Sequence, residues 1–118
     1  MATWKTVQKI AATLPDMEEG TSYGTPAFKV RGGKFMMRMR DGGRVRDEER
    51  NILVIRTSEK EALLADDRSI FFTTPHYDGY PSILVRLTKI TERELREMMT
   101  DAWRETAPPR ARKANPDL

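Results

Sequence analysis

The sequence TPAFKVRGGKFMMRMR, at residues 25–40, is the part of the chain that most clearly indicates a fold. It contains two runs of β-forming residues, 25–31 and 34–40, separated by a pair of glycines. Two adjacent glycines allow the positive φ angles of a two-residue type I′ turn, which joins two strands and fixes their register. The stretch therefore predicts a β-hairpin with Gly32 and Gly33 at its tip.

Side chains alternate between the two faces of a strand, so this hairpin has two chemically different faces. The predicted register pairs Arg31 with Lys34, Val30 with Phe35, Lys29 with Met36, Phe28 with Met37 and Ala27 with Arg38. One face is apolar and is expected to join the core: Phe28, Val30, Phe35, Met37 and Met39. The other face is a basic stripe around Met36: Lys29, Arg31, Lys34, Arg38 and Arg40.

Helices and further strands are predicted on both sides of the hairpin. An apolar stripe with helical spacing indicates a helix at 3–14, and the patterns SEKE at 58–61 and TERE at 91–94 are capping boxes that begin two more. The last helix has a core-facing stripe of Leu95, Met98, Met99, Ala102 and Trp103. Strands are predicted at 51–57, 83–87 and, as a short apolar segment, 70–73; loops are predicted at 15–24 and 41–50.

The order of these elements, α-β-β-β-α-(β)-β-α, predicts an α+β fold. Consecutive strands joined by tight turns favour an antiparallel sheet with the helices packed on one face, which is a two-layer sandwich. We expect a single domain at residues 1–107. The tail at 108–118 contains three prolines and almost no apolar surface, so we expect it to be disordered.

The composition of the chain excludes several kinds of chemistry. Its 118 residues include no cysteine and one histidine, which removes disulfides, thiolate nucleophiles, cysteine-bound zinc and paired-histidine metal sites. The glycine pairs match no phosphate-binding loop, so neither a cofactor nor a metal is expected. No apolar run approaches the roughly 20 residues of a membrane span, and the first residues form no apolar secretory segment. We therefore expect a cytoplasmic protein without a membrane partner, monomeric by default.

The net charge of +3 is concentrated in one part of the chain. Residues 23–46 hold seven lysines and arginines and one acidic residue. The seven are candidates for contacts with a phosphate backbone: Lys29, Arg31, Lys34, Arg38 and Arg40 on the stripe, with Arg44 and Arg46 in the next loop. Such contacts predict weak, salt-sensitive binding that is largely independent of sequence. The alternative is a solvated charged face that nearby acids such as Glu18 and Glu19 partly neutralise.

A second candidate site is the sequence HYDGYP at 76–81. In a recognition site, Tyr77 or Tyr80 would stack on a base or contact a small ligand beside His76, and Tyr23 would join the same surface. The structural alternative is that these tyrosines anchor the loop while Asp-Gly forms a turn. A catalytic alternative makes His76 a general base oriented by the aspartate of the loop.

Three motifs together resemble the MmcQ/YjbR-like family: EEGTSYGTPAF at 18–28, FFTTPHYDGYPSILVRL at 71–87, and Ala-Trp at 102–103 ahead of Ala-Pro at 107–108. The resemblance extends from about residue 4 to residue 109. It implies a small bacterial α+β protein with a fold similar to that of secretion chaperones and frataxin-like proteins. It also implies DNA binding through a double-wing arrangement, the activity usually ascribed to the family.

Two functional hypotheses follow from these patterns. The first is a non-enzymatic module that contacts DNA through the basic face of residues 25–40. The second is a protein-interaction or chaperone-like adaptor that presents the same face to an acidic protein partner. An enzyme is disfavoured because the sequence shows no nucleophile–base pair, metal cluster or cofactor fingerprint.

Overall fold

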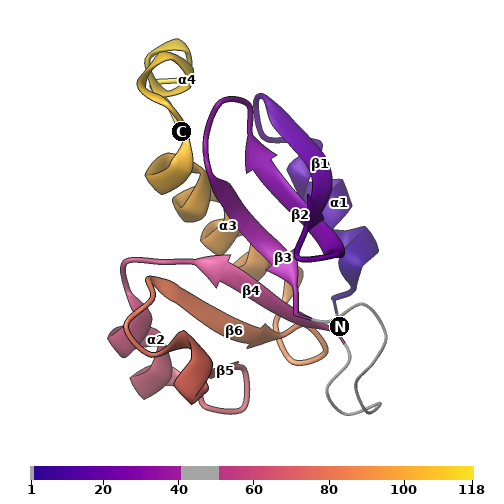
Figure 1. Ribbon diagram of the computed structural model, residues 1–118, viewed down its shortest axis with the longest axis vertical. Helices are drawn as coiled ribbons and strands as arrows, with labels where there is room; N and C mark the ends of the chain where they lie inside the picture. Colours follow the sequence, from indigo (N-terminus) through magenta and orange to yellow (C-terminus); the bar gives the residue numbers. More distant parts are fainter. Residues whose placement is uncertain (1, 41–50) are drawn as a thin grey trace.

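A computed structural model describes residues 2–40 and 51–118 of the chain. The described part is an α+β fold, as predicted, built on an antiparallel sheet with the strand order β1-β2-β3-β4-β6-β5 (Figure 1). The strands are β1 Met17–Ser22, β2 Thr25–Val30, β3 Phe35–Met39, β4 Ile52–Arg56, β5 Phe71–Phe72 and β6 Ser82–Arg86. The helices are α1 Trp4–Ala11, α2 Lys60–Asp66, the 3-10 turn η2 Pro75–Tyr77, α3 Glu92–Thr106 and α4 Pro109–Ala114.

Helices α1 and α3 cover one face of the sheet and lie behind it in Figure 1. The core lies between these two layers. Trp103 of α3 is buried, and its indole Nε1 donates a hydrogen bond to the carbonyl oxygen of Pro15 at 2.8 Å. Trp4 of α1 packs on Phe28 of β2 with the ring centroids 5.3 Å apart. Helix α2 adds leucines to the same core near β5, so the predicted two layers are present.

The opposite face of the sheet is left open by these helices. A row of cross-strand neighbours crosses it in the order Ala27, Arg38, Val54 and Leu84. At the β6–β5 end, the loop that contains η2 covers part of this face, where Tyr77 packs on a small apolar cluster that includes Val54 and Leu84. Between this loop and the β1–β2 hairpin, Ala27 and Val54 are buried, whereas Arg38 and Arg56 remain partly exposed.

Strand β1 forms where the sequence predicts a loop, so that prediction is wrong. Acidic residues and glycine have low strand propensity, but β1 is an edge strand whose side chains stay partly or fully exposed, and pairing with β2 holds it in place. Tyr23 and Gly24, with φ angles of 53° and 77°, form the two-residue turn between β1 and β2. Positive φ angles at both central residues are the type I′ pattern, which therefore occurs here.

The β2–β3 hairpin forms as predicted, but its tip has a different turn. Gly32 has a φ of 81°, whereas Gly33 is outside the positive region, so the predicted type I′ turn is wrong. The Gly33 N–H donates to the carbonyl oxygen of Val30 at 2.8 Å, and the positive φ at the third position is typical of a type II turn. A Cβ added to Gly33 would lie 2.5 Å from the carbonyl oxygen of Thr106. The tip therefore docks against the C-terminal end of α3.

A β-bulge in this hairpin changes the faces predicted for two residues. Two predicted pairs are confirmed: Phe28 with Met37 and Ala27 with Arg38. Lys29, however, pairs with Phe35 rather than with Met36, because a bulge places one extra residue on one strand. Phe35 is 38% exposed and Met36 is 1% exposed. The predicted core position of Phe35 and the predicted exposed position of Met36 are both wrong.

The C-terminal segment also differs from its prediction, because residues 109–114 form helix α4 where disorder is predicted. Proline suits the first position of a helix, since its missing N–H has no partner there in any case. Ala111 is 1% exposed and belongs to the core cluster, and Leu118 packs against that cluster. An apolar surface this small does not register in the composition, which is why the sequence pattern indicates a disordered tail.

The two predicted capping boxes have different outcomes. At α3, Thr91 is the N-cap and its Oγ1 accepts a hydrogen bond from the Glu94 N–H at 3.1 Å. At α2, the cap residue is Glu59 and makes no side-chain cap, while the N–H of Ser58 donates to Oε1 of Glu105. The predicted box at 58–61 is therefore wrong.

Within residues 2–40 and 51–118, no helix combines the length and apolar character needed to cross a membrane.

Candidate functional site

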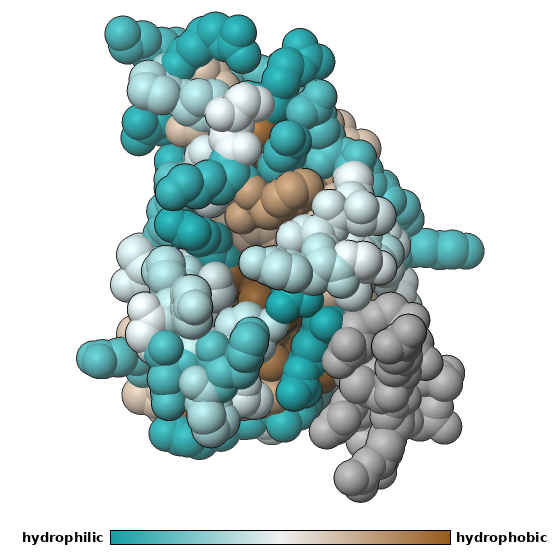
Figure 2. Space-filling view, viewed as in Figure 1, coloured by the Kyte–Doolittle hydropathy of each residue, from teal (hydrophilic) through white to brown (hydrophobic). Residues whose placement is uncertain are grey.

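A groove of about 710 Å³ lies on the open face of the sheet, and we call it the open-face groove. Figure 2 shows apolar surface at the bottom of this hollow, between more hydrophilic rims. Four separate parts of the chain line it: Ser22 and Tyr23; Phe35, Met36, Met37, Arg38 and Arg40; Val54 and Arg56; and His76, Tyr77, Tyr80 and Ser82. The groove therefore combines the β2–β3 hairpin with residues 76–81, which we call the aromatic loop. The sequence singles out these two sites separately.

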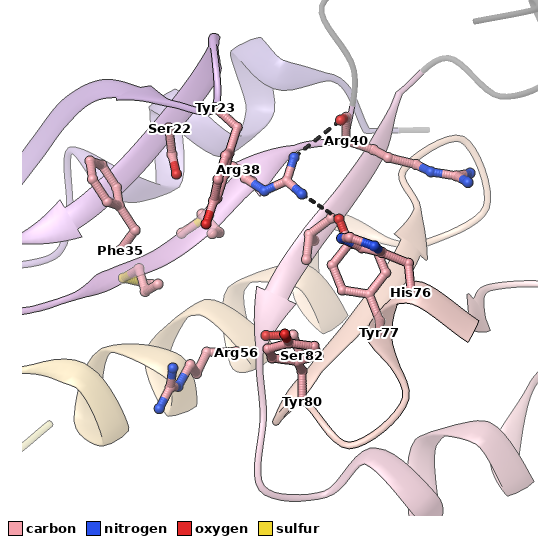
Figure 3. Close-up of a pocket in the computed structure, with 13 residues that line it drawn as sticks. Ser22, Tyr23, Phe35, Arg38, Arg40, Arg56, His76, Tyr77, Tyr80 and Ser82 are labelled. Atoms are coloured by element: carbon pink, nitrogen blue, oxygen red, sulfur yellow. Dashed lines mark hydrogen bonds between the residues drawn. The ribbon is translucent and has the colours of Figure 1, made fainter. Parts of the chain in front are cut away.

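Arg38 occupies a central position in the groove (Figure 3). Its guanidinium lies 5.3 Å from the ring centroid of Tyr23 and 5.9 Å from that of Tyr77. It donates hydrogen bonds to the Tyr77 hydroxyl and to the carbonyl oxygens of Met39 and Arg40, the latter two at 3.2 and 3.1 Å. These contacts fix the position of the charge before any ligand arrives, which lowers the entropy lost on binding.

Two more arginines, Arg40 and Arg56, line the same groove. Arg40 follows β3, and its N–H donates to the carbonyl oxygen of Ile52 at 2.9 Å; Arg56 ends β4 opposite Ser82 of β6. Among the described lining residues there is no aspartate or glutamate. The groove is therefore electropositive, and arginine is the side chain best suited to planar, bidentate contacts with phosphate or carboxylate.

Tyr23 combines an unfavourable backbone conformation with almost full exposure. Its φ of 53° is in the left-handed region, which in a type I′ turn is normally occupied by asparagine, aspartate or glycine. For another residue type that conformation costs about 1–2 kcal/mol. Its side chain is nonetheless 91% exposed and borders the groove, so little burial offsets this cost. Strain retained at an exposed aromatic residue is typical of functional positions.

The aromatic loop forms the other wall of the groove. Tyr77 packs on the apolar cluster of the open face, and its ring meets the His76 ring edge-on with the ring centroids 4.9 Å apart. Tyr80, in contrast, is 61% exposed. The ammonium of Lys60 in α2 donates hydrogen bonds to the carbonyl oxygens of Tyr77 and Tyr80, at 2.7 and 3.1 Å. Tyr77 is thus placed as a loop anchor and Tyr80 as an accessible ring, and Lys60 holds both.

His76 and Asp78 are the pair that a catalytic role of this loop would use, and both belong to the part of the chain that the structure describes. No hydrogen bond joins His76 to Asp78 there, although both lie in the aromatic loop. The described residues also contain no group of three or more histidine, aspartate or glutamate side chains placed to hold a metal ion. The arrangement of the groove is suited to holding a ligand through cationic and aromatic contacts.

The predicted basic stripe is divided between the groove and its surroundings. Arg38 and Arg40 line the groove, whereas Lys29 lies beside it with its Nζ 5.5 Å from the Phe35 ring centroid. Arg31 is near the hairpin tip, where its Nε lies 3.8 Å from an Oε of Glu18. Lys34 is exposed next to the turn, and Arg44 and Arg46 lie outside the described residues. The bulge and the tip turn end the alternation on which the five-residue stripe depends.

Two charged residues of the site, Arg56 and Lys60, are absent from the sequence-based prediction, and so is Phe35, which it places in the core. Arg56 shares the open face with Val54, two residues earlier in β4, and alternation along that strand could have indicated this. Lys60 carries no such signal, because its role depends on how α2 meets the aromatic loop. Its contacts are with backbone carbonyls, which no side-chain pattern in the sequence reports.

Comparison with known proteins identifies relatives along nearly the whole chain. The uncharacterized protein Mb2600 of Mycobacterium bovis is 36% identical over 122 residues, covering 92% of this chain and 91% of the relative. The uncharacterized protein Rv2570 of Mycobacterium tuberculosis matches with the same identity and the same coverage. No solved structure gives a significant match. A model of the YjbR family matches residues 12–105, and the chain therefore belongs to the YjbR family.

Proposed function

We propose that the protein is a non-enzymatic DNA-binding module that acts in the cytoplasm and holds the phosphate backbone in the open-face groove. The observation that carries this proposal is the set of three arginines, Arg38, Arg40 and Arg56, in a lining whose described residues include no carboxylate. The hydrogen bonds of Arg38 support it, because a charge that is already oriented loses less entropy when it meets a phosphate.

Three phosphate contacts give a definite salt dependence. Each phosphate neutralised on duplex DNA contributes a slope of about −0.9 to log K against log salt concentration, so we expect a slope of roughly −3. Phosphate contacts position the protein but do not read sequence. Binding should therefore be weak at physiological salt and similar for duplexes of unrelated sequence.

Fluorescence anisotropy of labelled DNA at several salt concentrations tests the proposal. The variant with both Arg40→Glu and Arg56→Glu reverses two charges in the groove, and it should lose most of its binding. The matched control carries Lys5→Glu and Arg93→Glu, which change the net charge equally in the first turns of α1 and α3, on the other side of the sheet. Acidic residues suit these positions because of the helix dipole. Equal loss in both variants would contradict a specific role for the groove.

An acidic protein partner is the second candidate. The groove also presents the exposed Tyr80 and the half-buried Arg56, and tyrosine and arginine are among the residues most enriched at the energetic centres of protein interfaces. An adaptor of this kind would capture a defined protein partner after nuclease treatment, and the charge-reversal variant would release it. DNA binding would then be absent from the anisotropy titration at low salt.

A further inference from the structure

The exposed aromatic side chains of the protein are gathered at one place. Within the described residues, three large hydrophobic side chains are exposed, namely Tyr23, Phe35 and Tyr80, and all three line the open-face groove. They come from the β1–β2 turn, from β3 and from the loop after η2, so no local pattern in the chain brings them together. Their convergence indicates that the groove recognises something with flat, partly apolar faces.

The three rings lie around the arginines rather than apart from them. Figure 3 shows Tyr23 and Tyr80 on different sides of the groove, with the guanidinium of Arg38 near Tyr23 and hydrogen-bonded to Tyr77. A ligand in this site meets cationic groups and aromatic faces within a single hollow. A single strand of nucleic acid matches both features, because its phosphates pair with the cationic groups and its unstacked bases stack on the aromatic faces. Proteins that bind single strands without sequence preference use this combination of contacts.

A duplex fits this arrangement less well than a single strand. The bases of a duplex are stacked on one another, so they offer a protein their edges in the grooves but not their faces. The duplex phosphates would reach Arg40 and Arg56 without giving the three exposed rings any base to contact. The strained backbone of Tyr23 would then bring no gain in binding.

We infer that the open-face groove binds single-stranded DNA in preference to duplex, with bases stacked on Tyr23, Phe35 and Tyr80 and phosphates held by the arginines. This inference rests on the proposed function, since it assumes that the phosphate backbone occupies this groove. It adds the contacts that distinguish one form of DNA from the other. It also gives a role to the exposed ring of Tyr23, which makes no burial contribution to the fold.

The test is a pair of anisotropy titrations with a labelled oligothymidine of about 12 nucleotides and a duplex of the same length. We expect the single strand to bind at least tenfold more tightly. The variant Tyr23→Asn keeps a residue suited to the turn and removes the ring, and Tyr80→Leu keeps apolar bulk without a ring. Each should weaken single-strand binding by about 5-fold to 150-fold, the range that corresponds to the loss of one stacking contact. Duplex affinity should change much less.

A ring-retaining control and the two negative outcomes make the result decisive. Tyr23→Phe keeps the aromatic face and should therefore bind the single strand more tightly than Tyr23→Asn does. Equal or tighter binding of the duplex, or full single-strand binding by both ringless variants, overturns the inference and leaves the proposed function standing. Binding of neither DNA at low salt overturns the inference and the proposed function together.

Discussion

One glycine in each hairpin turn of this protein is required for a different reason, Gly24 for its φ angle and Gly33 for space. At the β1–β2 turn, Gly24 supplies a positive φ in open surroundings, because a Cβ there would have no atom within 4 Å. At the β2–β3 turn, Gly33 has no positive φ but would bring a Cβ to 2.5 Å from the Thr106 carbonyl oxygen. The second turn is built for packing against α3. The first is free of packing and carries an exposed tyrosine, which is why we connect it with binding.

The largest effect is expected from filling the packed turn. Gly33→Ala forces the hairpin tip away from the backbone of α3, because a carbonyl oxygen cannot rotate away as a side chain does. We expect a loss of about 3 kcal/mol in the free energy of unfolding, at the upper end for overpacked sites, measured by urea denaturation. Gly20→Ala is the control, since Gly20 has open space around its Cβ position and no positive φ. If both variants are equally stable, the tip does not dock on α3.

At the exposed β1–β2 turn, the effect of a substitution on stability should depend on the backbone conformation that the new residue allows and not on the volume of its side chain. Gly24→Ala should cost about 1–2 kcal/mol, since alanine is unfavourable in the left-handed region. Gly24→Asn should recover most of this loss, because asparagine tolerates that region and has space here. The same change at Gly33 should be no better tolerated than alanine. A comparison of the four denaturation curves separates the two roles, and rescue by asparagine at both turns would contradict the distinction.

The difference between the turns also explains where the sequence could and could not predict the structure. Alternation along 25–40 correctly pairs Ala27 with Arg38 and places two of the arginines on the open face. The bulge that shifts Phe35 has no local signal in the sequence, and neither has the docking of the tip on α3, which is a contact between segments about 70 residues apart. A glycine pair indicates a turn, but it does not say whether φ or space requires each glycine.

Other parts escaped prediction for related physical reasons. Strand β1 is held by its pairing with β2, so its exposed acidic side chains carry no strand pattern. Helix α4 is anchored by a single small side chain, Ala111, within a charged and proline-containing tail. The candidate site was predictable as two lists of residues, the basic stripe and the tyrosines. Their meeting in one groove depends on the tertiary fold.

The position of the aromatic loop, which forms the wall of the groove opposite the β1–β2 turn, should depend on Lys60. Lys60→Met removes the two hydrogen bonds to carbonyl oxygens of the aromatic loop and keeps the length of the side chain. We expect a loss of about 1 kcal/mol in stability, since hydrogen bonds from a charged donor are stronger than neutral ones but these are only partly buried. DNA affinity should fall several-fold because Tyr80 is no longer held. The exposed Lys89→Met is the control, and equal effects of both changes would remove Lys60 from the site.

The smallest effect has the opposite sign, because the exposed turn should become more stable when its tyrosine is replaced. Tyr23→Asn relieves about 1 kcal/mol of left-handed strain and loses a cation–π contact with Arg38 worth about 0.5 kcal/mol at an exposed site. The balance is a gain of about 0.5 kcal/mol, which corresponds to a rise in Tm of about 2–3 °C by differential scanning calorimetry. Tyr23→Phe keeps both the strain and the ring, so its Tm should not change. A lower Tm for Tyr23→Asn would mean that the tyrosine contributes to folding, and its strain would then no longer point to binding. A higher Tm together with weaker DNA binding would show that stability at this turn is given up for a contact that only a ligand completes.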